Sequence, residues 1–221
     1  MLGWGNAIAL GIALAVLAGA PVEASGASLV LKAADDKAAP LQDTVVTVTP
    51  VGAALYDGKA LPEAVMGQKD KAFLPHVLVV RTGTVVRFPN EDDIKHNVYS
   101  FSPAKPFQLH LYGGEEVKTV LFDKAGVVVL GCNIHDQMLG YIVVTDSPFF
   151  MKSGPDGSAR LDGLPAGRYR LHVWHPRMQH EDEEPDREIA LAEGDMETLS
   201  LSLAVKPDRR MHGMMDDGYG Y

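Results

Sequence analysis

The chain has 221 residues, enough for one large domain or two small ones with a core each. Its residues are 46% hydrophobic and 22% charged, a globular composition that excludes a low-complexity or disordered chain. The net charge is -9 and no basic stripe is present, which argues against a nucleic-acid partner.

The N-terminus reads as a secretion signal. Residues 7–20 form an unbroken run of small and apolar residues, and a small-x-small cleavage site lies just before Ser25. The run is shorter than the roughly 20 residues that a membrane span needs. We therefore predict a signal peptide over residues 1–24, a periplasmic location and no membrane span in the mature chain. Because residues 1–6 contain no Lys or Arg, a buried helix or a retained anchor is the alternative.

The next part of the chain, residues 25–146, predicts an all-β domain. Runs rich in β-branched residues alternate with turn residues at intervals of about ten residues, as in a β-sandwich. The predicted strands are residues 29–31, 44–49, 77–80, 84–88, 97–101, 117–122, 127–130 and 141–144. Residues 53–70 show no clear period and predict a long loop or a short helix.

A break at residues 146–148 separates a second small β domain, which we place at residues 147–205. Residues 168–175 alternate with a period of two, and two further apolar runs follow at residues 188–191 and 198–205. Residues 206–221 have no apolar period and predict a disordered tail.

Candidate metal ligands cluster around the single cysteine. Cys132, His135 and Met138 form the pattern C-x2-H-x2-M between two apolar runs, and His96 lies upstream. One cysteine cannot form an internal disulfide, so in an exported protein it is a free thiol, an intermolecular bridge or a metal ligand. A thiolate, two imidazoles and a thioether are the ligand set of a blue-copper site.

These residues have two other interpretations, a zinc site and structural roles in the core or on the surface. Zinc usually takes four firm ligands, whereas the thioether of Met138 is a weak one. Each of the four residues taken alone is better explained as core or surface, since a free cysteine behaves as a small hydrophobe. The four together in this spacing favour copper. His76 and His110, which lie in or beside strands, are better explained as structural.

Residues 73–144 resemble the cupredoxin family, to which plastocyanin and amicyanin belong. The segments that carry the likeness are residues 73–75, 80–92, 96–98, Gly126 and 132–138. The short spacing between His135 and Met138 is similar to that of amicyanin. The resemblance implies a Greek-key sandwich with one type 1 copper ion, held by His96, Cys132 and His135 with Met138 as the axial ligand. It also implies that Asn97 ties the two ligand loops together, although a simple turn asparagine is the alternative.

The wider arrangement resembles bacterial proteins labelled methylamine utilization protein, in which a cupredoxin unit precedes a carboxypeptidase-regulatory-like β domain. The segments concerned are residues 88–90, 98–102, 131–136 and 174–177. The label names a grouping rather than a demonstrated role.

These observations predict an exported blue-copper protein that carries single electrons between redox proteins, such as a cytochrome or a periplasmic dehydrogenase. We expect no enzyme activity, because no Gly-x-Ser-x-Gly, phosphate loop, H-E-x-x-H or H-x-H pair is present. The alternative is a non-redox module for copper delivery or for contact with a protein or glycan.

Overall fold

A computed structural model describes residues 26–52, 62–178 and 186–208 of the chain. These residues form seventeen strands and no α-helix, which confirms the predicted all-β class. Within this part of the chain, no helix is long and apolar enough to cross a membrane. The predicted signal peptide, residues 1–24, lies outside the described residues.

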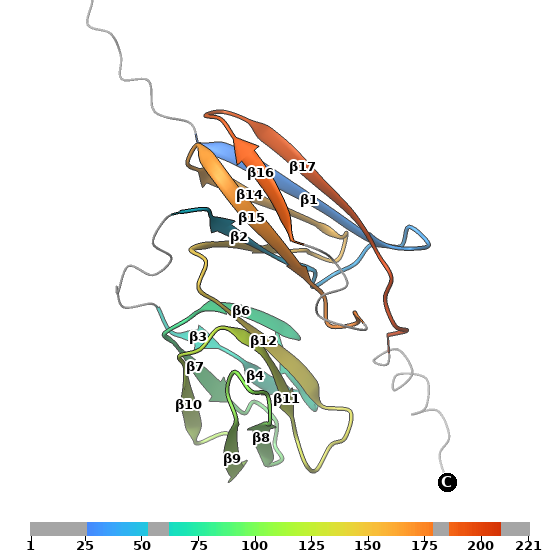
Figure 1. Ribbon diagram of the computed structural model, residues 1–221. Coiled ribbons are helices and arrows are strands. Elements are labelled where there is room, and N and C mark those ends of the chain that lie inside the picture. The colour runs from blue at the N-terminus through green and yellow to red at the C-terminus, as the bar shows by residue number, and fades with distance from the viewer. Residues whose placement is uncertain (1–25, 53–61, 179–185, 209–221) are drawn as a thin grey trace, which may run out of the picture.

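The strands form two units that are not consecutive in the sequence (Figure 1). The flanking unit contains β1 (Ala27–Asp35), β2 (Val45–Pro50), β13 (Phe149–Lys152), β14 (Ser158–Leu164), β15 (Gly167–Trp174), β16 (Arg187–Leu191) and β17 (Met196–Leu203). The inserted unit contains β3 (Ala64–Val65), β4 (Gly67–Lys69), β5 (Ala72–Leu74), β6 (Val77–Arg81), β7 (Thr84–Pro89), β8 (His96–Ser100), β9 (Phe107–Tyr112), β10 (Val117–Phe122), β11 (Gly126–Gly131) and β12 (Leu139–Thr145).

The flanking unit has two sheets, with strand orders β14-β1-β17 and β13-β2-β15-β16. The predicted division at residues 25–146 and 147–205 is therefore wrong at its N-terminal side, since β1 and β2 belong with the C-terminal strands. Strand β1 pairs in parallel with β17 along its length, and its alternate residues Leu29 and Leu31 are buried in the core that both sheets share. Strand β2 pairs with β13 and β15.

The inserted unit has a five-stranded sheet of order β6-β12-β11-β8-β9 and a three-stranded sheet of order β10-β7-β3. Successive side chains of a strand point to opposite faces, so every second side chain is buried between these two sheets. On β11 and β12 the buried set is Val128, Leu130, Ile142 and Val144. The hairpin of β4 and β5 turns at Asp70 and Lys71, whose φ angles of 52° and 55° suit a tight two-residue hairpin.

The outer face of the five-stranded sheet packs against the flanking unit. Val77 and Val143 contact Val45 and Trp174 in a small core of their own. The rings of Tyr141 and Trp174 meet edge to face, with 5.4 Å between centroids. Trp174 is thus a core residue that joins the two units.

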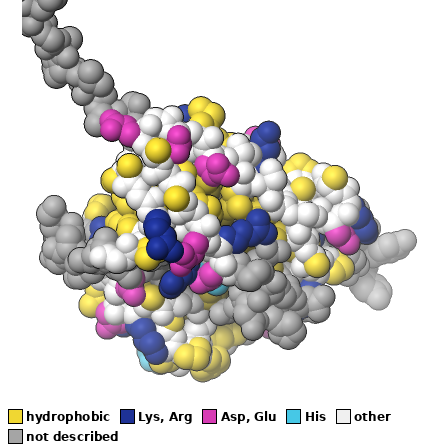
Figure 2. Space-filling model, turned by 45° about the horizontal axis from the view of Figure 1, so that its top comes forward, with side chains coloured by type: hydrophobic (Ala, Val, Ile, Leu, Met, Phe, Trp, Pro, Cys, Tyr) yellow, Lys and Arg dark blue, Asp and Glu magenta, His cyan; other side chains and the backbone are white. Residues whose placement is uncertain are grey.

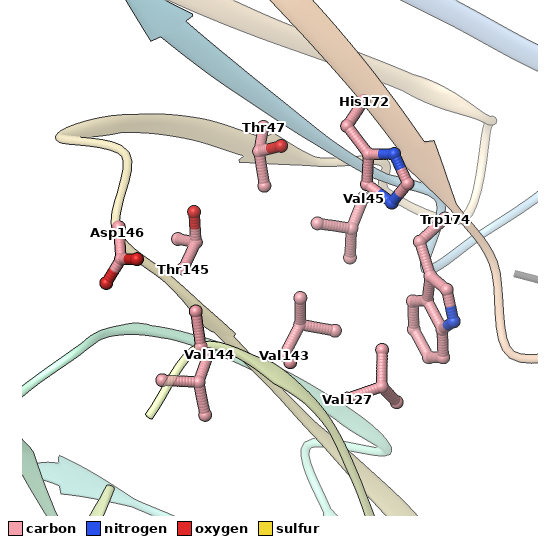
Figure 3. A pocket seen from close by; sticks show the side chains of 11 residues that line it. Val45, Thr47, Val127, Val143, Val144, Thr145, Asp146, His172 and Trp174 are labelled. Atoms are coloured by element: carbon pink, nitrogen blue, oxygen red, sulfur yellow. The ribbon is translucent and has the colours of Figure 1, made fainter. Parts of the chain in front are cut away.

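A small cavity of about 190 Å³ lies along this junction (Figure 3). Trp174 and His172 of β15 face Val127 and Val143 of the inserted unit across it. On the face of the molecule that Figure 2 shows, acidic and basic side chains are interspersed, and neither sign forms a continuous stripe.

Three local predictions need correction. The described part of residues 53–70 contains short strands rather than a helix. Strand β9 is absent from the predicted set, although apolar and polar residues alternate along Phe107–Tyr112 as in a half-buried strand. The predicted disordered tail starts too early, since the Lys206 backbone N–H donates to Arg177 O over 2.8 Å. Residues 209–221 lie outside the described residues.

Candidate metal centre

Three of the four candidate ligands, His96, Cys132 and His135, lie at one end of the five-stranded sheet. Cys132 follows β11 directly, and the pairing of Gly131 with Leu139 closes the loop that contains His135. His96 opens β8, which pairs with β11 where Tyr99 lies opposite Gly131. The sheet therefore brings a distant histidine to the cysteine loop, as the sequence predicts.

The donor atoms of these residues converge. The Cys132 sulfur lies 3.9 Å from His96 Nδ1 and 4.0 Å from His135 Nδ1, and the three atoms lie within 4.8 Å of one another. His96 and Cys132 are buried, and His135 is partly exposed. Among the described residues, this is the one group of at least three His, Cys, Asp or Glu side chains placed to hold a metal ion.

The separations fit a single small ion. Bonds of about 2.0 Å to nitrogen and about 2.3 Å to sulfur, at about 120°, place nitrogen and sulfur about 3.7 Å apart, whereas a tetrahedral angle gives about 3.5 Å. The observed 3.9 and 4.0 Å are slightly longer than either value, and the three atoms are close enough to share one ion. The donor set of one thiolate and two imidazoles fits copper, which takes a His2Cys trigonal base.

Met138 is buried in the same core cluster as Cys132, with 1% of its side chain exposed. Its backbone N–H donates to His135 O over 2.9 Å, which closes the turn that returns the chain to β12. Met138 is thus the last residue of the ligand loop before β12 begins at Leu139. Its axial role stays a prediction.

Asp92 is the neighbour that sequence reasoning missed. Its Oδ2 accepts a hydrogen bond from His96 Nε2 at 2.7 Å. The other ring nitrogen, Nδ1, is therefore free to face the Cys132 sulfur. The same carboxylate accepts the backbone N–H groups of Asp70 and Lys71 at 2.7 and 3.0 Å. Burial raises the pKa of Asp92, but these hydrogen bonds outweigh it, so the pKa lies below its ordinary value. The carboxylate is therefore ionised and orients the imidazole.

Asn97 ties the two ligand segments together, as the family resemblance implies. Its Oδ1 accepts the backbone N–H of Asn133 at 2.9 Å, and the Cys132 sulfur lies 3.4 Å from the same oxygen. The segment after the cysteine is thereby held to the segment after His96.

A buried polar network lies under the strand of His96. Tyr112, which pairs with His96 across β8 and β9, donates its hydroxyl to Phe88 O over 2.8 Å and accepts from Gln68 Nε2. Burial raises the pKa of Tyr112 to about 12. The phenol is therefore neutral and serves as a fixed support. Gln68 is not part of any motif in the sequence, so its contact with Tyr112 could not be predicted.

The remaining histidines have other surroundings. His172 is exposed and lies 2.9 Å from Asp186, whereas His175 is buried with Nε2 3.1 Å from Gln42 O. The two rings have different partners because residues three apart on a strand point to opposite faces of the sheet. Burial, and then the nearby His96, lower the pKa of His135 below its ordinary value, which favours the neutral ring that can bind a metal.

No family model matches the sequence, and a search of curated proteins found no match. Among solved structures, a Cu-containing nitrite reductase from Thermus scotoductus SA-01 is 29% identical, with a TM-score of 0.37, over 46% of this chain and 26% of that one. The chain thus spans about a quarter of the reductase.

Two smaller proteins are also similar to part of the chain. Amicyanin from Paracoccus versutus is 20% identical, with a TM-score of 0.35, over 44% of this chain and 97% of its own. A purple cupredoxin from Nitrosopumilus maritimus is 23% identical, with a TM-score of 0.32, over 38% of this chain and 100% of its own.

Proposed function

We propose that this chain is a type 1 copper protein of the cupredoxin kind that carries single electrons. His96, Cys132 and His135 would be the equatorial ligands, and Met138 the axial one. The observation that carries the proposal is the convergence of two Nδ1 atoms on one sulfur within 4.8 Å. Copper bound there would supply a one-electron couple.

The surroundings of the site suit electron transfer. His96 begins β8, and the other three residues lie on the short loop between the paired strands β11 and β12. Asp92 and Asn97 hold the two segments through hydrogen bonds. A site fixed in this way changes little when the charge of the ion changes, which keeps reorganisation small. His135 is the ligand nearest the surface, and Ile134 beside it is 53% exposed, so this end would exchange electrons with a partner.

Copper titration tests the proposal directly. We expect the copper(II)-loaded protein to absorb strongly in the visible range because the thiolate donates charge to the metal, and Cys132→Ser to abolish the colour. Reversible one-electron cycling would favour transfer over the alternative of copper delivery, for which very tight copper(I) binding without an accessible couple is expected. A colourless copper-saturated protein would eliminate the electron-carrier proposal.

Export to the periplasm and a partner of the cytochrome or dehydrogenase class belong to the same proposal, as does the assignment of the flanking unit to the carboxypeptidase-regulatory-like type. We propose a carrier rather than an enzyme. N-terminal sequencing of the protein recovered from the cells tests the export step, and a start at Ser25 is the expected result.

A further inference from the structure

The cavity between the two units contains a polar group that the fold leaves unused. Thr47 of β2 lines this cavity and is 8% exposed, yet its hydroxyl makes no hydrogen bond within the described residues. A buried hydroxyl without a partner lowers stability, whereas a valine of the same shape carries no such cost. Val45, two residues earlier on the same face of β2, shows that an apolar side chain fits at this junction. The Thr47 hydroxyl is therefore better explained by a molecule that occupies the cavity.

His172 supplies a second polar atom beside the first. It lies directly opposite Thr47 on β15, so both side chains are on the same face of the sheet, and its ring projects over the cavity (Figure 3). Its Nδ1 lies 2.9 Å from the Asp186 carboxylate. An ionised carboxylate can only accept, so Nδ1 carries the proton, and Nε2 of the neutral ring is an acceptor. This Nε2 has no hydrogen bond within the described part of the chain.

The rest of the cavity is mainly apolar. Trp174, Val45 and Val143 line it and are buried. It opens to water where His172 and Asp146 lie, since both side chains are exposed. A cavity of about 150 Å³ with apolar walls holds one benzene molecule. The volume here, about 190 Å³, therefore has room for one substituted ring.

The charged side chains around the opening already have partners. Arg170, the next residue of β15 on the same face as His172, lies 3.6 Å from Glu188. Asp146 accepts the Thr82 hydroxyl at 2.5 Å. An anionic ligand would meet no unpaired cation among these residues, and a cationic group would lose its water against apolar walls. These surroundings favour a neutral occupant.

We propose that the cavity is a binding site for a small neutral phenol. The aromatic ring would lie beside Trp174, the phenolic O–H would donate to His172 Nε2, and the phenolic oxygen would accept from the Thr47 hydroxyl. Both unused polar atoms would then be paired, as buried polar groups usually are. Thr47 and His172 belong to the flanking unit, whereas Val127 and Val143 belong to the inserted unit, so the phenol would bridge the two.

This site is separate from the candidate metal centre. Val127 lines the cavity near the start of β11, and Cys132 follows the other end of the same strand. At about 3.3 Å per residue, the two residues lie about 16 Å apart. A phenol in the cavity would therefore not be a ligand of the ion, and its binding needs neither copper nor any change in bonds or electrons.

Binding is tested with the metal-free full chain, labelled with 15N and titrated with phenol. We expect saturable shifts at the indole N–H of Trp174 and at the amides of Val127 and Val143. Thr47→Val, which removes the hydroxyl and keeps the shape, should weaken phenol binding about three- to tenfold, the usual effect of one hydrogen bond. Thr49→Val, on the same face of β2 but outside the cavity, is the matched control and should change binding less than about twofold.

Toluene separates recognition of the hydroxyl from simple filling of an apolar space. It has the shape of phenol with a methyl group in place of the hydroxyl, so Thr47→Val should not weaken its binding. The absence of saturable shifts with phenol, or shifts confined to residues away from the cavity, would overturn the site. Unchanged phenol affinity in Thr47→Val, or an equal loss for phenol and toluene, would overturn the role of the hydroxyl. Failure of copper to bind or cycle would leave each of these results unaffected.

Discussion

The residue that most shapes the candidate site is Asp92, although it is not a ligand. Its carboxylate lies between the His96 ring and the two left-handed residues of the β4–β5 turn, Asp70 and Lys71. One side chain thus joins the hairpin turn to the ligand segment. A carboxylate that accepts the proton-bearing nitrogen of a metal-binding histidine fixes its tautomer and makes the ring a stronger donor.

Asp92→Asn should therefore weaken copper binding by about 10- to 100-fold and raise the reduction potential. The potential rises because the removed negative charge stabilised copper(II) more than copper(I). Competition titration and voltammetry measure the two effects. Asp93→Asn, at the adjacent exposed position, is the matched control. Equal potentials in the wild-type protein and Asp92→Asn would contradict this role.

At the scale of elements, β12 does three things at once. Its inner face fills the core of the inserted unit through Ile142 and Val144, and its outer face contacts the flanking unit through Val143. It begins immediately after Met138. Its position is set in part by Gly140, where an added Cβ would lie 2.7 Å from the Cβ of Phe73. That contact involves the rigid base of a buried side chain.

Gly140→Ala should lower the free energy of unfolding by about 1–3 kcal/mol, because β12 and β5 must move apart to admit the methyl group. Urea denaturation followed by fluorescence measures the loss. Gly113→Ala is the control, since the nearest atom to an added Cβ there is Lys95 Cγ at 3.8 Å. Identical denaturation midpoints for the two variants would show that β12 tolerates the shift.

The same element shows what a sequence can predict. The ligand loop before β12 is local, so C-x2-H-x2-M predicts Cys132, His135 and Met138 as ligands, and the upstream His96 completes the donor set. The contact between Asp92 and the β4–β5 turn is different, because it depends on how a segment without a clear period folds. A carboxylate four residues before a histidine is too common a pattern to reveal it.

For the whole molecule, the main finding is that one unit is inserted into the other. Strands β1 and β2 come before the inserted unit in the chain, yet they pair only with β13, β14, β15 and β17 in the described residues. The sequence does not reveal this insertion, because alternating apolar residues specify which face of a strand is buried but not which strand pairs with it. Because β1 and β2 precede the inserted unit directly in the sequence, they were assigned to it and not to the C-terminal strands with which they pair.

Fragments test this arrangement. Residues 62–146 contain both sheets of the inserted unit and should unfold in one cooperative transition. Residues 25–146, the division predicted from the sequence, add β1 and β2 without their partner strands and should aggregate, because unpaired apolar strands associate. Circular dichroism and size-exclusion chromatography distinguish the two. A monomeric 25–146 fragment with slow amide exchange in residues 27–35 would contradict the insertion.

The insertion also sets an order of events during synthesis. A ribosome produces β1 and β2 first and must then translate the entire inserted unit before β13 emerges. During that interval Leu29, Leu31, Val46 and Val48 have no native core to enter. We therefore expect β1 and β2 to stay without native partners until β13 to β17 are available to pair with them.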